Sequence, residues 1–188
     1  MKGVNIILAD GFEDMEAIAT RDVLLRAGIQ VKTVSIGDYM VTSSHGLEVC
    51  ADSLLEEIEE DGQTPGKEDI MIFPGGMPGS RNLAENEGLM ALMKEHFNAG
   101  GTVAAICAAP GLVASQLDLP ASFRFTCFDG FEGPLQAKGG IFTAESVTID
   151  GRLITGRGAG HAVNFGLAIA GYILGSDTVA KVRHGLML

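Results

Sequence analysis

Short apolar runs alternate with longer segments of mixed polarity through most of the chain. The most compact runs, which have the character of buried strands, span residues 4–9, 31–36, 69–73 and 102–106. Between them, the segments 16–27, 86–97 and 108–117 place apolar or small residues at a helical spacing. Gly28 stands where a glycine commonly ends a helix. This alternation predicts an α/β fold, doubly wound, with a mainly parallel sheet and helices on both faces.

The remaining segments predict smaller elements of the same domain, which we expect to span 1–188. Residues 40–50 indicate two short strands and a turn, and 147–155 indicate a hairpin whose Asp150-Gly151 pair suits a type I′ turn. Residues 162–174 are apolar on nearly every side, which is typical of a buried helix. The acidic run 56–61 predicts a solvated helix end and loop without a functional role.

Charge and cysteine content narrow the classes of function. The 188 residues include 13 Lys plus Arg and 24 Asp plus Glu, a net charge of −11, which argues against nucleic acid and anionic membranes as partners. No apolar run reaches the ~18 residues of a membrane span, and no signal peptide is evident. The three cysteines are widely separated and odd in number, which favours a reducing, cytoplasmic location and argues against a zinc site.

Cys107 is the most distinctive candidate for chemistry. The sequence TVAAICAAPG delivers this cysteine from a buried strand to the start of a predicted helix, through a turn flanked by alanines. Small neighbours suit a sharp, crowded turn of the nucleophile-elbow type. A helix N-terminus stabilises a thiolate through its positive end and its free N–H groups. The alternative is a buried structural cysteine that packs as a small hydrophobe.

Glu16 is the candidate partner of that thiol. Glu13 and Asp14 are expected to be ordinary acidic residues at a helix start, whereas Glu16 begins the amphipathic pattern and is expected to point to the sheet edge. A buried carboxyl and a thiolate do not readily carry two charges side by side. We therefore expect a coupled pair in which the carboxyl keeps its proton and donates it to sulfur.

Two glycine-rich turns also follow predicted strands. Pro74-Gly75-Gly76 allows backbone N–H groups to face a small anion or a developing oxyanion, although such a turn is common without any function. The glycines of residues 155–161 follow the spacing G-x-G-x-G, which differs from the dinucleotide motif G-x-G-x-x-G, and no acidic residue follows ~20 positions later. We therefore expect no dinucleotide site.

Taken together, these segments resemble the ThiJ/PfpI superfamily. The motifs ADGFEDMEA, IFPGG, AAICAAP and TGRGAG carry the resemblance, which runs over about residues 4–182 and is strongest to the branch of the parkinsonism-associated protein deglycase. The resemblance implies a flavodoxin-like sandwich, usually a homodimer, with an oxidation-prone nucleophilic cysteine.

Matching residue by residue, the resemblance implies a site. Cys107 takes the place of the nucleophile, and Glu16 that of the carboxyl bonded to it. The N–H groups of Gly76 and Ala108 take the oxyanion positions. Cys50 matches a cysteine that lies near the dimer contact in related proteins.

One segment departs from the family pattern. Many relatives carry Thr-His-Pro near the nucleophile, whereas this chain reads Thr126-Cys127-Phe128. The change disfavours functions that need a Cys–His dyad, peptidase or amidase activity above all. Cys127 is a candidate second thiol able to resolve an oxidised Cys107, although burial as a plain apolar residue is the better interpretation.

Two further residues are accessory candidates. His161 substitutes for the absent histidine if it reaches the pocket, although a role as a helix-start residue is the better interpretation, and Arg157 lies in the same TGRGAG segment. The other histidines, to which we assign no chemistry, fall on a turn, a helix and the C-terminal tail: His45, His96 and His184.

These residues lead to two hypotheses of different class. The first is an enzyme of the glyoxalase III or deglycase type that acts on a small aldehyde or glycated substrate without cofactor or metal. In it the thiolate adds to the carbonyl, backbone amides hold the oxyanion, and the carboxyl moves a proton. The second is a redox-sensing stress-response or holding-chaperone protein, signalled by oxidation of Cys107 to the sulfinate.

Overall fold

A seven-stranded sheet forms the middle layer of the computed structural model, which describes residues 1–58 and 64–188. The strand order is β10-β11-β7-β6-β1-β2-β5, and every neighbouring pair is parallel except β10 with β11. The strands are β1 (Val4–Leu8), β2 (Val31–Ser35), β5 (Ser53–Leu54), β6 (Ile70–Phe73), β7 (Thr102–Ile106), β10 (Val147–Asp150) and β11 (Leu153–Gly156). The predicted fold class is confirmed.

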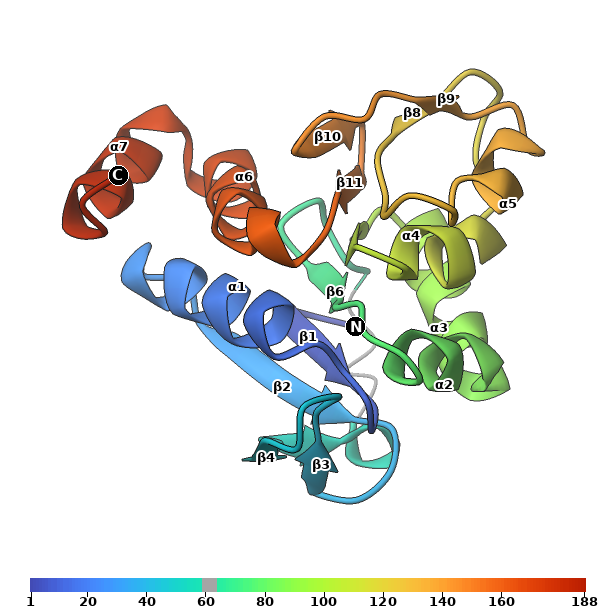
Figure 1. The fold of residues 1–188 in the computed structure, drawn as a ribbon, viewed down its shortest axis with the longest axis horizontal. Helices are drawn as coiled ribbons and strands as arrows, with labels where there is room; N and C mark the ends of the chain where they lie inside the picture. The colour runs from blue at the N-terminus through green and yellow to red at the C-terminus, as the bar shows by residue number, and fades with distance from the viewer. Residues whose placement is uncertain (59–63) are drawn as a thin grey trace.

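Helices cover both faces of this sheet (Figure 1). One face carries α1 (Asp14–Arg26) and α6 (Ala162–Leu174), with α7 (Ser176–Gly185) packed on α6. The other face carries α2 (Gly79–Glu85), α3 (Glu87–Asn98), α4 (Ala109–Leu112) and α5 (Gly133–Gln136). Three short 3-10 turns are η1 (Leu55–Glu57), η2 (Ala114–Gln116) and η3 (Ala159–His161).

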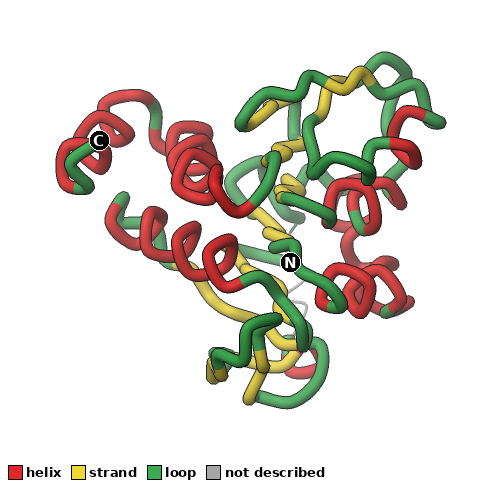
Figure 2. The backbone as a smooth tube through the Cα atoms, in the orientation of Figure 1, coloured by secondary structure: helices red, strands yellow, loops and turns green. Residues whose placement is uncertain are grey.

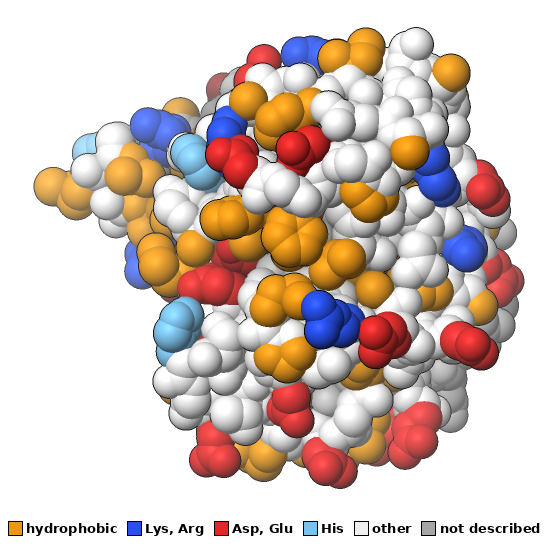
Figure 3. All heavy atoms as spheres, turned by 45° about the vertical axis from the view of Figure 1, so that its right-hand side comes forward, with side chains coloured by type: hydrophobic (Ala, Val, Ile, Leu, Met, Phe, Trp, Pro, Cys, Tyr) orange, Lys and Arg blue, Asp and Glu red, His pale blue; other side chains and the backbone are white. Residues whose placement is uncertain are grey.

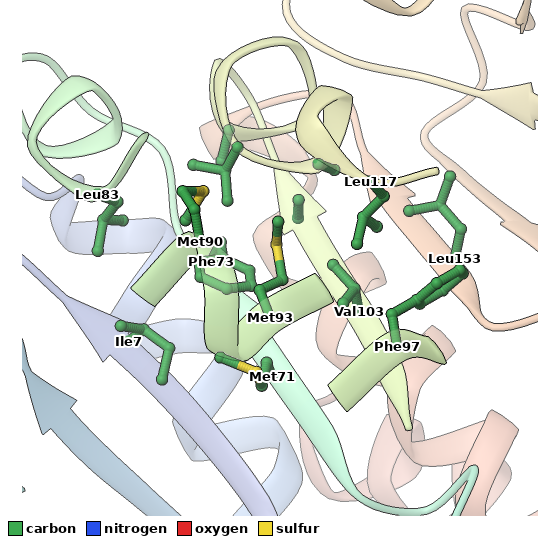
Figure 4. Close-up of a cluster of buried hydrophobic side chains, with 14 of the residues drawn as sticks. Ile7, Met71, Phe73, Leu83, Met90, Met93, Phe97, Val103, Leu117 and Leu153 are labelled. Atoms are coloured by element: carbon green, nitrogen blue, oxygen red, sulfur yellow. The ribbon is translucent and has the colours of Figure 1, made fainter. Parts of the chain in front are cut away.

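The central strands are apolar on both sides, because each side faces a helical layer. Every residue of β1, β6 and β7 is buried, as the continuous apolar runs predict. Successive residues alternate between the two cores: Ile6 belongs to the cluster under α1 and α6, and Ile7 to the cluster under α3. Figure 4 shows the second cluster, in which Met90, Met93 and Phe97 of α3 lie over side chains of the sheet.

Two pairs of short strands lie outside the main sheet (Figure 2). The predicted hairpin over 40–50 is confirmed as antiparallel β3 (Met40–Thr42) and β4 (Glu48–Cys50). A second pair, parallel β8 (Arg124–Phe125) and β9 (Ile141–Phe142), was not predicted. Of the acidic run 56–61, the first residues belong to η1 and the loop, and residues 59–61 lie outside the described part of the chain.

Several predicted details are wrong. The helix expected over 108–117 is broken into α4 and η2, and the Ser115 hydroxyl donates a hydrogen bond back to Gly111 O (2.6 Å) at the break. The turn of the β10–β11 hairpin is Gly151-Arg152, because Asp150 pairs with Leu153. Of these two turn residues Gly151 alone has a positive φ, 57°, whereas a type I′ turn needs two.

Three helices of the described residues lie outside the predicted elements, and one of them is the four-residue α5. Segment 79–85 is helix α2, although its start in a Pro-Gly-rich stretch is typical of a turn. Residues 176–185 form α7, so His184 lies in a helix and not in an irregular tail. No helix in the described part of the chain has both the length and the apolar character needed to cross a bilayer.

Candidate active site

The candidate residues meet at the carboxyl ends of three adjacent strands. The loop that leads into α1 follows β1, the Pro74-Gly75-Gly76 turn follows β6, and Cys107 follows β7. The sheet places β6 between β1 and β7, and Figure 1 shows α1 and α4 on either side of β6. The chain moves from β1 to β2 on one side and later from β6 to β7 on the other. This is the topological switch point at which open α/β sheets bind ligands.

Cys107 is held in a strained backbone conformation at the junction between β7 and α4. Its φ is +65°, in the left-handed region that residues with a side chain rarely occupy. Both polar groups of its backbone are engaged: its N–H donates to Gly156 O (3.0 Å), and its carbonyl accepts from the Phe128 N–H (2.8 Å). Strand β11 and the loop after β8 therefore fix the elbow from outside the β7–α4 unit.

Gly75 allows the carboxyl and the sulfur to come together. Its N–H donates to Glu16 Oε2 (2.6 Å). A Cβ built at Gly75 would lie 2.5 Å from Glu16 Oε2, 2.5 Å from Cys107 Cβ and 3.0 Å from Cys107 Sγ. The carboxyl and the thiol therefore face each other across a position that has no room for any side chain.

Burial makes the Glu16 carboxyl a weak acid. The residue is 1% exposed, and burial raises its pKa to about 7, despite the opposing hydrogen bond from Gly75. Its Oε2 accepts that bond, whereas Oε1 has no hydrogen-bond partner among the described residues. An unpaired buried oxygen penalises the charged carboxylate and favours the protonated acid.

The thiol is also hard to ionise while the carboxyl carries a charge. Burial and then the negative charge of Glu16 raise the pKa of Cys107 to about 12, while the N–H groups of Ala108 and Gly76 act in the opposite direction. The pair therefore holds a single negative charge over a wide pH range. The expected support from a helix dipole is small, because α4 has only 4 residues. Local N–H groups near the sulfur supply the positive potential.

The turn after β6 is locked against the start of α1. The Glu13 N–H donates to Gly75 O (3.0 Å), and a Cβ at Gly76 would lie 2.5 Å from both Glu13 N and Gly11 O. The Glu13 side chain caps α1 by accepting from the Glu16 N–H (2.8 Å). Glu13 thus acts as the helix-start acid that the sequence predicts, and its cap also orients Glu16.

No hydrogen bond among the described residues joins the side chain of Cys127 or Arg157 to the Cys107 thiol. Cys127 is buried in the core cluster under α3, whereas Cys107 packs against the cluster on the other face of the sheet. The plain apolar interpretation of Cys127 therefore fits the structure. Arg157 donates to Ala144 O (2.5 Å) and to the Asp129 carboxylate (2.8 Å), so its side chain connects two loops.

His161 lies at the end of η3 and forms the N-cap position of α6, which is the helix-start role that the sequence favours. It is half-buried, and no hydrogen bond within the described ranges joins its ring to Cys107 or Glu16. Its ring is thus not seen to replace the histidine of the Thr-His-Pro segment.

One group of side chains has the geometry of a metal site. Ligand atoms of Glu13, Asp14 and His45 lie within 4.8 Å of one another. The Asp14 carboxylate already accepts from the Ser43 hydroxyl (2.7 Å) and pairs with the exposed His45 ring (2.7 Å), and Glu13 caps α1. The Asp14 partner raises the pKa of His45. Ion pairing and capping account for this group without a cation.

Sequence reasoning missed two residues of the site. The sequence indicates Gly75 only as part of a turn, although its N–H donates to Glu16 and its lack of a side chain allows the close approach; the paired glycines after a strand are the signal for it. Phe128 was noted only as part of a departure from a motif, and no local pattern indicates its bond to Cys107.

The chain matches known proteins over nearly its full length. Residues 2–171 match the model of the DJ-1/PfpI family. The chain is 34% identical to protein dj-1beta of Drosophila melanogaster, over 100% of this chain and 97% of that protein. It is 32% identical to the Parkinson disease protein 7 homolog of Danio rerio, with 97% and 95% covered. It is also 32% identical to the glutathione-independent glyoxalase DJR-1.2 of Caenorhabditis elegans, with 94% and 90% covered.

Solved structures give the same result. The crystal structure of Drosophila melanogaster DJ-1beta superposes with a TM-score of 0.87 at 32% identity, over 100% of this chain and 98% of that one. An oxidized Toxoplasma gondii DJ-1 gives a TM-score of 0.88 at 26% identity, with 100% and 98% covered. The chain therefore belongs to the DJ-1/PfpI family and, within it, to the DJ-1 branch.

Proposed function

We propose that the protein is a cofactor-free enzyme that acts on small reactive carbonyl compounds through Cys107, in the manner of a glyoxalase III or a deglycase. The observation that carries the proposal is the meeting of the Glu16 carboxyl and the Cys107 thiol across Gly75. This arrangement pairs a nucleophile with an acid whose pKa lies near neutrality. The name of the Caenorhabditis elegans relative, a glutathione-independent glyoxalase, supports the same class of reaction.

The reaction on methylglyoxal begins with the singly ionised pair. The sulfur of Cys107 adds to the aldehyde carbon and forms a hemithioacetal, while the N–H groups of Gly76 and Ala108 stabilise the developing oxyanion. Glu16 gives its proton to that oxygen and becomes the base for the next step. On a glycated substrate, the same addition labilises the bond to the amine or thiol that carries the carbonyl compound.

The second half of the reaction moves a proton between two carbons. The Glu16 carboxylate removes the proton from the former aldehyde carbon, and the electron pair forms an enediolate with its charge on the oxygen of the neighbouring carbon. The hydroxyl proton of the first carbon passes to that oxygen, and the Glu16 carboxyl returns its proton to the neighbouring carbon, which leaves a thioester of lactate on Cys107. Water hydrolyses the thioester, lactate leaves, and the thiol and carboxyl return to their starting state. Methylglyoxal and water are consumed, and lactate is the product.

Lactate formation by metal-free recombinant protein tests this proposal. Cys107→Ala is expected to abolish turnover, and Glu16→Gln to lower kcat by about 100-fold or more, as for loss of a general acid–base group. Cys127→Ala is the matched control, because that thiol lies in the other core cluster and its variant is expected to keep kcat. Wild-type rates of lactate formation by Cys107→Ala would refute the proposal.

A second candidate function is redox sensing by the same sulfur. Cys107 is partly accessible, and an added oxygen would meet the Gly76 and Ala108 N–H groups and the unpaired Oε1 of Glu16. The oxidized state of the Toxoplasma gondii structure supports this reading. Mild peroxide is expected to add two oxygens to Cys107 before it modifies the exposed Cys50. Peptide mass mapping that finds Cys50 oxidised first would exclude the sensor.

We also propose that the protein forms a homodimer in a reducing compartment such as the cytoplasm. Exposed apolar side chains follow one side of α1, at Met15, Ile18 and Leu25, and others lie on the β3–β4 hairpin, at Met40 and Leu47. Such a surface is typical of a protein–protein contact. The three free cysteines fit a reducing compartment.

A further inference from the structure

Phe128 stands directly beside the nucleophile. Its N–H donates to the carbonyl of Cys107 (2.8 Å), so the two backbones lie side by side. Its side chain is nevertheless 52% exposed and belongs to neither of the core clusters that flank the sheet in the described part of the chain. A large aromatic ring that is exposed next to a reactive thiol serves no evident purpose in packing the core.

The Phe128 ring packs between two neighbours, Gly158 and Phe131. Its Cδ2 lies 3.3 Å from the position of a Cβ at Gly158, so any side chain there would press on the ring. Phe131 meets it edge to face, with centroids 6.4 Å apart. The Arg157–Asp129 ion pair (2.8 Å) braces the adjoining residue. The ring is therefore a preorganised surface.

A second exposed apolar side chain follows the turn whose N–H group faces Cys107. Gly76 presents its N–H to Cys107, and the next residue, Met77, is exposed. Gly76 follows β6, whereas Gly158 follows β11, and β7 with its cysteine lies between these two strands. The two strands beside β7 are thus followed by a thioether and by a glycine packed on an aromatic ring, two surfaces suited to an aryl group. Apolar side chains also gather near the middle of the face in Figure 3, with acidic and histidine side chains at their edge.

We propose that Phe128 determines specificity at Cys107 and that the site takes aryl-substituted carbonyl compounds, such as phenylglyoxal, in preference to alkyl ones, such as methylglyoxal. The inference rests on the proposed carbonyl chemistry for turnover, but it makes a separate statement about which groups bind beside the sulfur. The substrate ring stacks on Phe128 when its aldehyde carbon reaches Cys107. Asp129 does not oppose this contact, because Arg157 pairs with it.

Steady-state kinetics with the two substrates test the preference. In Phe128→Ala, kcat/KM for phenylglyoxal is expected to fall about fivefold more than kcat/KM for methylglyoxal, the size of one aromatic contact, and chiefly through KM. Phe128→Tyr keeps the ring and is expected to keep the ratio. Ile149→Ala removes an equally exposed apolar side chain on β10, and it is expected to leave both substrates unchanged. Equal losses for both substrates in Phe128→Ala would show a structural role and overturn the inference.

A second measurement does not depend on turnover. Alkylation of Cys107 by 2-bromoacetophenone and by bromoacetone forms one S–C bond and releases bromide in each case. The ratio of the two rates, divided by the same ratio for free N-acetylcysteine, is expected to fall about fivefold in Phe128→Ala and to be retained in Phe128→Tyr. An unchanged ratio overturns the inference. If wild-type protein turns over neither carbonyl compound while this ratio depends on Phe128, the proposed enzyme fails and the aryl preference of the site stands.

Discussion

Glu16 and Cys107 share one buried corner of the sheet, and the negative charge of Glu16 raises the pKa of the Cys107 thiol. The carboxyl has one oxygen bound to the Gly75 N–H and the other oxygen without a partner. Loss of the first proton from the pair leaves one negative charge, which is shared between the carboxyl and the thiol. The proposed addition to a carbonyl uses the form of the pair in which the sulfur carries this charge and Glu16 keeps its proton.

The raised pKa of Glu16 predicts how stability depends on pH. The folded protein binds the Glu16 proton up to about pH 7, whereas the unfolded chain releases it near 4.5. The contribution of the protonated acid is therefore complete below pH 4.5 and is lost as the pH rises through 7. Glu16→Gln removes this loss, so its free energy of unfolding relative to wild type is expected to rise by about 3 kcal/mol between pH 4.5 and 8. Urea denaturation at the two pH values measures this difference.

Glu95→Gln is the control for that series, because Glu95 is an exposed residue of α3. It should show little change in relative stability over the same interval. A Glu16→Gln profile parallel to that of wild type would mean that the carboxyl is already ionised in the folded protein at acidic pH.

The close approach at Gly75 makes a second prediction. In Gly75→Ala the new methyl group overlaps the Glu16 carboxyl and the Cys107 side chain, so the free energy of unfolding is expected to fall by about 2 kcal/mol and Cys107 to react more slowly with iodoacetamide. Gly133→Ala is the matched control, because nothing lies within 4 Å of its added methyl group. Equal stability and thiol reactivity in both variants would contradict the contact.

At the scale of elements, Asn86 connects two helices. It ends α2, and its side chain caps α3 by accepting from the Leu89 N–H (2.9 Å). Asn86→Ala is expected to lower the free energy of unfolding by about 1 kcal/mol, whereas Asn86→Asp retains an acceptor and most of the stability. Thermal or urea unfolding distinguishes the two variants. Similar losses for both would mean that the cap contributes little.

The elements that the sequence predicts well are those whose pattern is set by burial. β1, β6 and β7 are apolar at almost every position because both their faces are covered, and their order along the chain indicates a parallel sheet. Helix α2 was missed because its start carries Pro78 and Gly79, which are typical of turns. Helix α7 was missed because only Val182 is buried in it, so tertiary contact with α6 decides its structure.

The candidate site likewise contains residues that the sequence predicts and contacts that it does not predict. Cys107 and Glu16 are recognisable because each follows a strand and carries chemistry. The contacts that make them a pair depend on Gly75, and the position of Phe128 depends on the loop that follows β8. Such contacts between distant segments have no periodicity, so a single sequence does not reveal them.

At the scale of the whole molecule, the exposed apolar side of α1 predicts an assembly. Ile18→Glu places a charge in the middle of this surface and is expected to convert a dimer into a monomer, measured by light scattering after size exclusion. Ile149→Glu, on the exposed edge strand β10, is expected to leave the dimer intact. A monomeric wild-type protein, or a dimeric Ile18→Glu variant, would contradict the assignment of this surface.

Both polar groups of the Cys107 backbone are hydrogen-bonded, so a modification of its sulfur is expected to cause little movement of the main chain. With its N–H bound to Gly156 and its carbonyl bound to Phe128, the main chain has little freedom to relax around an enlarged sulfur. Atoms attached to that sulfur are accommodated by groups that already surround it, and the architecture of the sheet stays as it was. A partner that distinguishes the protein modified at Cys107 from the unmodified protein is therefore expected to contact the surface around Cys107 directly, where the charge and shape have changed.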